Sequence, residues 1–111
     1  MDGMRELFIA GLATLFLAPS AEALGASPAV QIRGDAYAPR TLTIGVGQSV
    51  TFTNDDDDAH TVTAVDGTFD SKGLDTNDVW HHTFTRAGRY AYFCELHPFM
   101  KGTIVVTEAT R

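Results

Sequence analysis

Cysteine is scarce in this chain of 111 residues, which contains only Cys94. A single cysteine cannot form a disulfide within its own chain, although small exported domains often depend on disulfides. An unpaired cysteine in an exported domain indicates an intermolecular bridge, a reactive thiol or a metal ligand. A buried, inert cysteine is the alternative reading, and it is common in proteins in general.

Clustered positive charge is also missing. The chain has 8 Lys and Arg residues against 14 Asp and Glu residues, which gives a formal net charge of −6. Nucleic acids and anionic membrane surfaces favour proteins with clustered cations, so we expect neither as a partner. The densest charge is the acidic run at residues 55–58. Such a run is more often a solvated loop than a docking surface, although a cationic protein partner is compatible with it.

No apolar run is long enough to span a membrane. The longest, residues 7–18, is shorter than the run of about 20 residues that a transmembrane helix needs. The small-x-small pattern Ala21-Glu22-Ala23 follows it, as signal peptidase requires. We therefore predict a cleaved signal peptide over residues 1–23, a single domain over residues 24–111, and a periplasmic or otherwise exported location. An uncleaved tether is the less favoured alternative, and Met1 and Met4 both remain possible translation starts.

Helical periodicity is absent after residue 26, where short alternating runs are separated by turn residues. Leu42 and Ile44 alternate with threonines, and Val50 and Phe52 alternate in the same way. This pattern is typical of strands that bury one face. It predicts an all-β fold, a Greek-key β-sandwich of about seven to eight strands. The clearest runs are residues 30–33, 40–44, 49–54, 61–65, 79–85, 89–94 and 102–108.

The segment from Cys94 to Met100 carries the strongest chemical signal. Cys94, His97 and Met100 follow one another at intervals of three residues, directly after a predicted strand. Copper in its two oxidation states is well served by two imidazoles and one thiolate in a trigonal arrangement with a weak axial thioether. This loop could supply three of those four ligands. A second histidine must then come from another part of the chain.

His60 is the best candidate for that second imidazole. It stands between the acidic run and the strand predicted at residues 61–65. A surface histidine on a polar loop is the alternative for any isolated histidine. His81 and His82 lie within another predicted strand, where neighbouring side chains point to opposite faces. We interpret both as structural, with one solvated and the other packed beside Trp80 and Phe84.

The chain resembles the cupredoxin family from about residue 31 to residue 106, and the complete set of motifs in order is far more specific than a lone Cys-x-x-His. The compact ligand loop is similar to those of the amicyanin, pseudoazurin and plastocyanin group. The matching motifs are Tyr37-x-Pro39, Gly47-x-x-Val50-x-Phe52-x-Asn54, His60-Thr61-Val62, Phe69-Asp70-Ser71, Phe84, Gly88-x-Tyr90-x-Tyr92-x-Cys94-x-x-His97-Pro98-Phe99-Met100 and Gly102.

The resemblance implies one type 1 copper ion and a role for each ligand. His60 and His97 would bind through Nδ1, Cys94 through its sulfur, and Met100 axially. The backbone N–H of Thr61 would donate a hydrogen bond to the Cys94 sulfur.

The resemblance also implies roles around the site. The edge of His97 would reach the surface through an apolar rim that includes Pro98 and Phe99. Tyr90 would form a tyrosine corner that stabilises the sandwich. The chain departs from the amicyanin pattern at Glu95-Leu96 and at Ala59, which bears on the choice of partner and leaves the ligands intact.

These features together predict an exported blue copper protein that carries single electrons. Because protein ligands fill all four positions, we expect no enzymatic chemistry at the metal. Expected partners are redox proteins such as a c-type cytochrome or a dehydrogenase, and we expect a monomer. A copper storage or delivery protein is one alternative, although such proteins usually carry Met-rich or His-rich clusters. A sandwich adhesion module with accidental spacing is the other.

Overall fold

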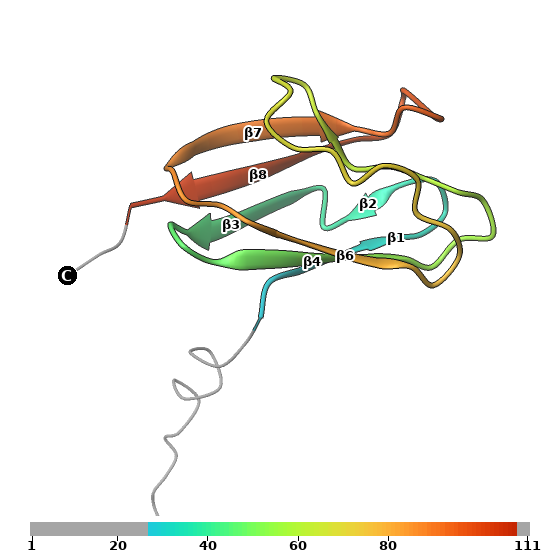
Figure 1. The fold of residues 1–111 in the computed structure, drawn as a ribbon, viewed down its shortest axis with the longest axis horizontal. Coiled ribbons are helices and arrows are strands. Elements are labelled where there is room, and N and C mark those ends of the chain that lie inside the picture. The colour runs from blue at the N-terminus through green and yellow to red at the C-terminus, as the bar shows by residue number, and fades with distance from the viewer. Residues whose placement is uncertain (1–26, 109–111) are drawn as a thin grey trace, which may run out of the picture.

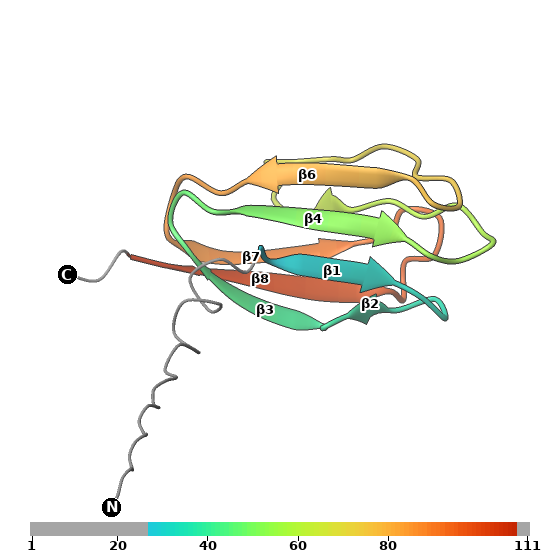
Figure 2. The ribbon, with the colours of Figure 1, turned by 90° about the horizontal axis from the view of Figure 1, so that it is seen from below.

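Two four-stranded sheets face each other in the computed structural model, which describes residues 27–108 (Figures 1 and 2). The prediction of an all-β Greek-key sandwich is confirmed, since those residues form eight strands and no helix. The first sheet contains, in spatial order, β2 (Tyr37–Ala38), β1 (Ala29–Ile32), β4 (Ser49–Asn54) and β6 (Val79–Thr83). The second contains β3 (Thr41–Gly45), β8 (Lys101–Thr107), β7 (Gly88–Phe93) and β5 (Thr63–Ala64).

Both sheets are mixed, because each contains one parallel pair of strands. Strand β1 runs parallel to β4, and β3 runs parallel to β8, whereas the other pairs are antiparallel. Within the strands, alternate side chains enter the space between the sheets, as the sequence pattern predicts. The buried apolar residues from the longer strands are Val30, Ile32, Ile44, Val50, Phe52, Tyr92, Ile104 and Val106.

Two strand predictions differ from the structure. Strand β2 has only two residues and was not predicted. The strand predicted at residues 61–65 is reduced to β5, Thr63–Ala64. The segment before β5 pairs instead with an irregular loop, where His60 and Leu74 exchange backbone hydrogen bonds of 3.0 and 2.7 Å. Loop backbone therefore replaces a regular neighbouring strand at this position.

Several connections gather at one end of the sandwich, at the right of Figures 1 and 2, and the end of β8 lies at the opposite end. They are the β1–β2 turn at residues 33–36, the segment 55–62 after β4, and the β7–β8 loop at residues 94–100. In the β1–β2 turn Gly34 and Asp35 both have positive φ, and Arg33 N–H donates to the Ala36 carbonyl at 2.9 Å. These are the marks of a type I′ hairpin turn.

The described part of the chain contains no helix that could cross a membrane. The predicted signal peptide at residues 1–23 lies outside the described residues.

Candidate metal centre

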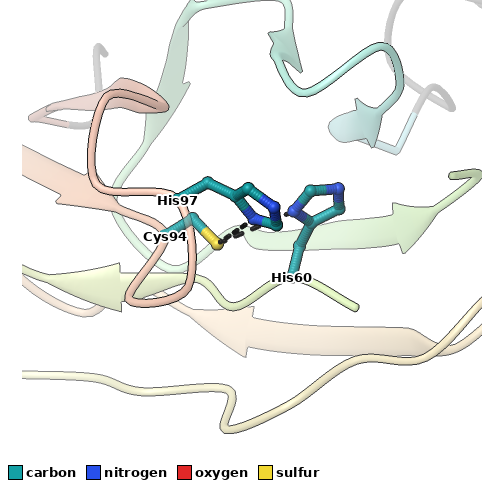
Figure 3. A group of neighbouring side chains, drawn as sticks. All are labelled: His60, Cys94 and His97. Carbon is teal, nitrogen blue, oxygen red and sulfur yellow. Dashed lines mark hydrogen bonds between the residues drawn. The ribbon is translucent and has the colours of Figure 1, made fainter. Parts of the chain in front are cut away.

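Three of the predicted ligands converge at the end of the sandwich where the connections gather (Figure 3). The sulfur of Cys94 lies 3.7 Å from Nδ1 of His60 and 3.7 Å from Nδ1 of His97. Cys94 comes directly after β7, His97 lies within the β7–β8 loop, and His60 lies before β5. Cys94 and His60 are fully buried. Two imidazole nitrogens and a thiol sulfur therefore face one shared point.

The spacing of these atoms fits a transition-metal ion. In zinc sites of proteins, the metal lies about 2.0 Å from an imidazole nitrogen and about 2.3 Å from a thiolate sulfur. With angles near 120°, those bonds place nitrogen and sulfur about 3.7 Å apart. Both observed N···S distances are 3.7 Å. The donor set of two imidazoles and one thiolate is the trigonal set that copper electron-transfer sites use.

Met100 closes the loop that carries Cys94 and His97. Its backbone N–H donates to the His97 carbonyl at 2.8 Å, and Cys94 N–H donates to the Met100 carbonyl at 3.2 Å. Only 2% of the Met100 surface is exposed. The thioether is therefore enclosed at the same end of the sandwich as the other three predicted ligands, and its axial role stays a prediction.

Hydrogen bonds fix the surroundings of the sulfur. Thr61 N–H donates to Cys94 Sγ at 3.3 Å, which confirms the contact that the resemblance implied. The Thr61 carbonyl accepts a hydrogen bond of 2.5 Å from the Tyr37 hydroxyl. The Thr61 side-chain oxygen, Oγ1, accepts one of 2.9 Å from Glu95 N–H. Burial raises the pKa of Tyr37, and the charge on Cys94 adds to the effect, so the phenol stays protonated and keeps donating.

Sequence reasoning missed the residue that holds the far side of the His60 ring. The carboxylate of Asp56 accepts from His60 Nε2 at 2.9 Å, and from the backbone N–H groups of Gly34 and Asp35 at 2.7 and 3.0 Å. Burial tends to raise the pKa of Asp56, but the hydrogen bonds from Asp35, Gly34 and His60 outweigh it and lower the pKa. The Asp–x–x–x–His spacing was visible in the sequence, but the acidic run concealed it.

Asn54 organises the loop that leads to His60. It is fully buried, and its Nδ2 donates to the carbonyls of Asp58 and Leu74 at 2.9 and 2.8 Å. Its Oδ1 accepts from Asp56 N–H at 2.9 Å. Because all three bonds reach backbone atoms, one side chain fixes the path of the acidic run.

Comparison with known proteins identifies the family. A family model described as a cupredoxin-like domain matches residues 7–106. The chain belongs to the cupredoxin family. Among curated proteins, amicyanin-alpha of Methylorubrum extorquens is 32% identical and the alignment covers 93% of this chain and 99% of that protein. Amicyanin of Paracoccus denitrificans is 34% identical over 78% of this chain and 70% of that protein.

Solved structures agree with that assignment. The Cu(I) form of a mutant of amicyanin has a TM-score of 0.69 at 33% identity, covering 72% of this chain and 81% of the other. A Cu-containing nitrite reductase from Thermus scotoductus has a TM-score of 0.71 at 29% identity. This chain aligns over 91% of its own length with only 25% of that enzyme. Cupredoxin domains therefore also occur as parts of larger enzymes.

The outer edge of this cupredoxin's site is apolar. His97 is half-buried, while Leu96 and Phe99 are 58% and 69% exposed and Pro98 is also exposed. The predicted rim of Pro98 and Phe99 thus lies at the surface beside His97, and Leu96 extends it. The carboxylates of Asp35 and Asp58 and a ring nitrogen of His97 lie within 4.8 Å of one another. The rim is therefore bordered by negative charge.

The two remaining histidines lie away from the four predicted ligands and pack within or beside β6. His82 stacks on Trp80 with ring centroids 5.3 Å apart and also contacts Phe84 at 4.8 Å. His81 is exposed and its Nδ1 lies 3.0 Å from Thr51 Oγ1. Burial of the His82 ring at the edge of the core lowers its pKa below the ordinary value for histidine.

Tyr90 forms the predicted corner at the turn before β7. Its hydroxyl donates to the Arg86 carbonyl at 2.7 Å, four residues earlier in the chain. The bond joins the strand to the turn that precedes it, as a tyrosine corner does in a sandwich.

Proposed function

We propose that this cupredoxin is a blue copper protein that carries single electrons, with one type 1 copper ion held by His60, Cys94, His97 and Met100. The observation that carries the proposal is the convergence of two imidazole nitrogens on one thiol sulfur, each at 3.7 Å. The similarity to amicyanins supports it. Copper, when bound there, supplies reversible one-electron chemistry.

The protein's contribution is to hold the donor atoms in one arrangement. His60 and Cys94 are fully buried, and each is held by a hydrogen bond, His60 by Asp56 and the Cys94 sulfur by Thr61 N–H. Thr61 N–H donates to the sulfur and stabilises its negative charge, which is how outer hydrogen bonds tune such centres. A framework that does not rearrange suits a carrier that gains and loses one electron.

We propose that the protein is not an enzyme. Four protein ligands leave no open position for a substrate, whereas a catalytic metal keeps one. The similarity to nitrite reductase is confined to a quarter of that chain, so it supports a shared domain rather than a shared reaction.

Electrons enter and leave through His97, whose half-buried ring lies behind the exposed rim of Leu96, Pro98 and Phe99. An exposed apolar rim allows close approach of a partner and costs little desolvation. The partners are redox proteins such as a c-type cytochrome or a dehydrogenase, and the carrier is a monomer. Residues 1–23 are a signal peptide that directs export, so the protein works in the periplasm or another exported location.

Copper reconstitution tests the proposal. Purified protein given one equivalent of Cu(II) should turn intensely blue and bleach with ascorbate, because copper–thiolate bonding produces the colour. Cys94→Ser should stay colourless with an unchanged circular dichroism spectrum. His81→Ala, which removes an exposed ring from β6, is the matched control and should remain blue. A folded wild-type protein that binds Cu(II) without colour would contradict the proposal.

A further inference from the structure

Asp56 lies behind the imidazole of His60, on the side away from the sulfur. We propose that Asp56 is a positioning residue that fixes the tautomer and orientation of His60 and raises its strength as a ligand for Cu(II). The proposal rests on the function proposed above. It assigns a distinct task to one residue of an acidic run that otherwise looks uniform in the sequence.

The argument begins with the two nitrogens of the imidazole ring. In neutral histidine one nitrogen carries the proton and the other carries the lone pair. Carboxylate oxygens only accept hydrogen bonds, and Asp56 Oδ2 lies 2.9 Å from His60 Nε2. The proton therefore resides on Nε2. The lone pair resides on Nδ1, which lies 3.7 Å from the Cys94 sulfur.

The carboxylate itself has little freedom to move. Its Oδ1 accepts from Gly34 N–H at 2.7 Å, and its Oδ2 accepts from Asp35 N–H at 3.0 Å. Both donors belong to the type I′ turn between β1 and β2, whose positive φ angles direct consecutive N–H groups to one side. The backbone of Asp56 is fixed as well, because its N–H donates to Asn54 Oδ1. The β1–β2 turn thus holds His60 through one intervening side chain.

Burial makes this contact strong. The His60 side chain is fully buried and that of Asp56 is only 16% exposed, so water screens the interaction weakly. Asp35 adds a second carboxylate, with its Oδ1 3.5 Å from the same nitrogen. Negative charge at Nε2 makes the ring a better donor at Nδ1, and a better donor favours Cu(II) over Cu(I). His97 has no hydrogen-bond partner at Nε2 among residues 27–108.

Two substitutions separate the hydrogen bond from the charge. Asp56→Asn removes the charge and leaves one oxygen that can accept, and Asp56→Ala removes both. Asp57→Asn and Asp57→Ala are the matched controls, because Asp57 is the exposed neighbour in the same run. The dissociation constant for Cu(II) is measured by competition with a chelator, and the reduction potential by voltammetry. Nitrogen-15 NMR of the copper-free protein reports the tautomer of His60 directly.

We expect Asp56→Ala to weaken Cu(II) binding on the order of 10- to 100-fold, the usual effect of losing such an outer partner, with a smaller effect for Asp56→Asn. If the substitution raises the dissociation constant for Cu(II) ten times more than that for Cu(I), the reduction potential rises by about 59 mV. The copper-free Asp56→Ala variant should show both tautomers of His60, whereas wild type shows only the Nε2–H form. Asp56→Glu, which keeps the carboxylate, should restore part of the affinity.

Equal effects of the Asp56 and Asp57 substitutions on affinity and potential would overturn the proposal, because the two residues would then act only as charges. An unchanged tautomer in copper-free Asp56→Ala would overturn it as well. A colourless copper complex of the wild type would instead overturn the proposed function, while the NMR result on the copper-free protein would still decide the role of Asp56.

Discussion

The two histidines of the candidate metal centre have opposite surroundings. His60 is fully buried, and its Nε2 is held by a carboxylate that the β1–β2 turn fixes in place. His97 is half-buried on the β7–β8 loop, beside the exposed side chains of Leu96 and Phe99. One imidazole therefore belongs to the scaffold and the other to the surface. A carrier needs both: a fixed side that keeps the geometry and an open side that a partner can approach.

The largest difference should appear when each imidazole is removed and then replaced from solution. In His97→Gly, external imidazole should restore the blue colour quickly, because the vacated position faces solvent. In His60→Gly, the vacated position is enclosed, so entry requires a local opening of the protein. An opening that costs about 3 kcal/mol slows entry on the order of 100-fold. Stopped-flow absorbance after mixing with imidazole measures both rates, and equal rates would contradict the comparison.

Met100 lies on the same loop as His97 but is enclosed like His60. An axial thioether forms a long, weak bond, so Met100→Leu should keep the blue colour. Its reduction potential should rise, because loss of a donor disfavours Cu(II). Voltammetry and the visible spectrum test this together. A colourless but folded Met100→Leu protein would show that Met100 holds the metal more strongly than an axial ligand does.

The open side should also respond to salt. Asp57 and Asp58 are exposed in the described structure, so replacing both with Asn should slow association with a basic c-type cytochrome. The wild-type rate should fall as the Debye length decreases from ~30 Å at 0.01 M to ~10 Å at 0.1 M salt, and the variant should show a shallower slope. Glu108→Gln, a charge change beyond β8, is the control. If wild type and the double variant show the same dependence of association rate on salt, these charges do not steer the partner and the apolar rim alone determines docking.

The smallest effect concerns His82, which lies outside the metal centre and should change stability without changing colour. Its ring packs on Trp80 and Phe84, so His82→Ala should lower the free energy of unfolding by about 1 to 2 kcal/mol. Burial lowers the pKa of His82 in the folded protein, so the unfolded state binds the proton more readily. Wild type should therefore lose stability as the pH falls through about 6.5, the ordinary pKa of histidine.

Urea denaturation of the copper-free proteins at pH 7.5 and pH 5.5 measures this contribution. His82→Phe should show a smaller loss of stability between the two pH values than wild type. His81→Ala is the control, because His81 is exposed on the same strand. A loss of equal size in wild type and His82→Phe would assign the pH dependence to other groups.

The local parts of this site could be predicted from sequence, and the non-local parts could not. Cys94, His97 and Met100 are recognisable because a short loop after a strand fixes their spacing. His60 could be selected over His82 because β alternation places His82 against aromatic side chains. The role of Asp56 depends on the β1–β2 turn, whose N–H groups fix its carboxylate. The four-residue spacing from Asp56 to His60 is present in the sequence, but it does not reveal the contact with the turn.

The same limit explains the errors in the strands. The sequence of residues 61–65 predicts a full strand, but β5 covers only Thr63–Ala64. The backbone before β5 forms hydrogen bonds with the loop around Leu74 instead of with a strand. Strand length depends on the neighbour that supplies the hydrogen bonds as well as on the residues themselves. Strand β2 is too short to carry a pattern and exists because the type I′ turn returns the chain alongside β1.

The acidic run shows how identical residues can be under unequal constraint. Asp56 pairs with the buried His60 at 2.9 Å, whereas Asp55, Asp57 and Asp58 are exposed, and Asp55 makes only a surface pair with Arg33 at 3.1 Å. In a saturation mutagenesis library selected for copper-dependent colour, position 56 should accept few replacements and position 57 should accept many.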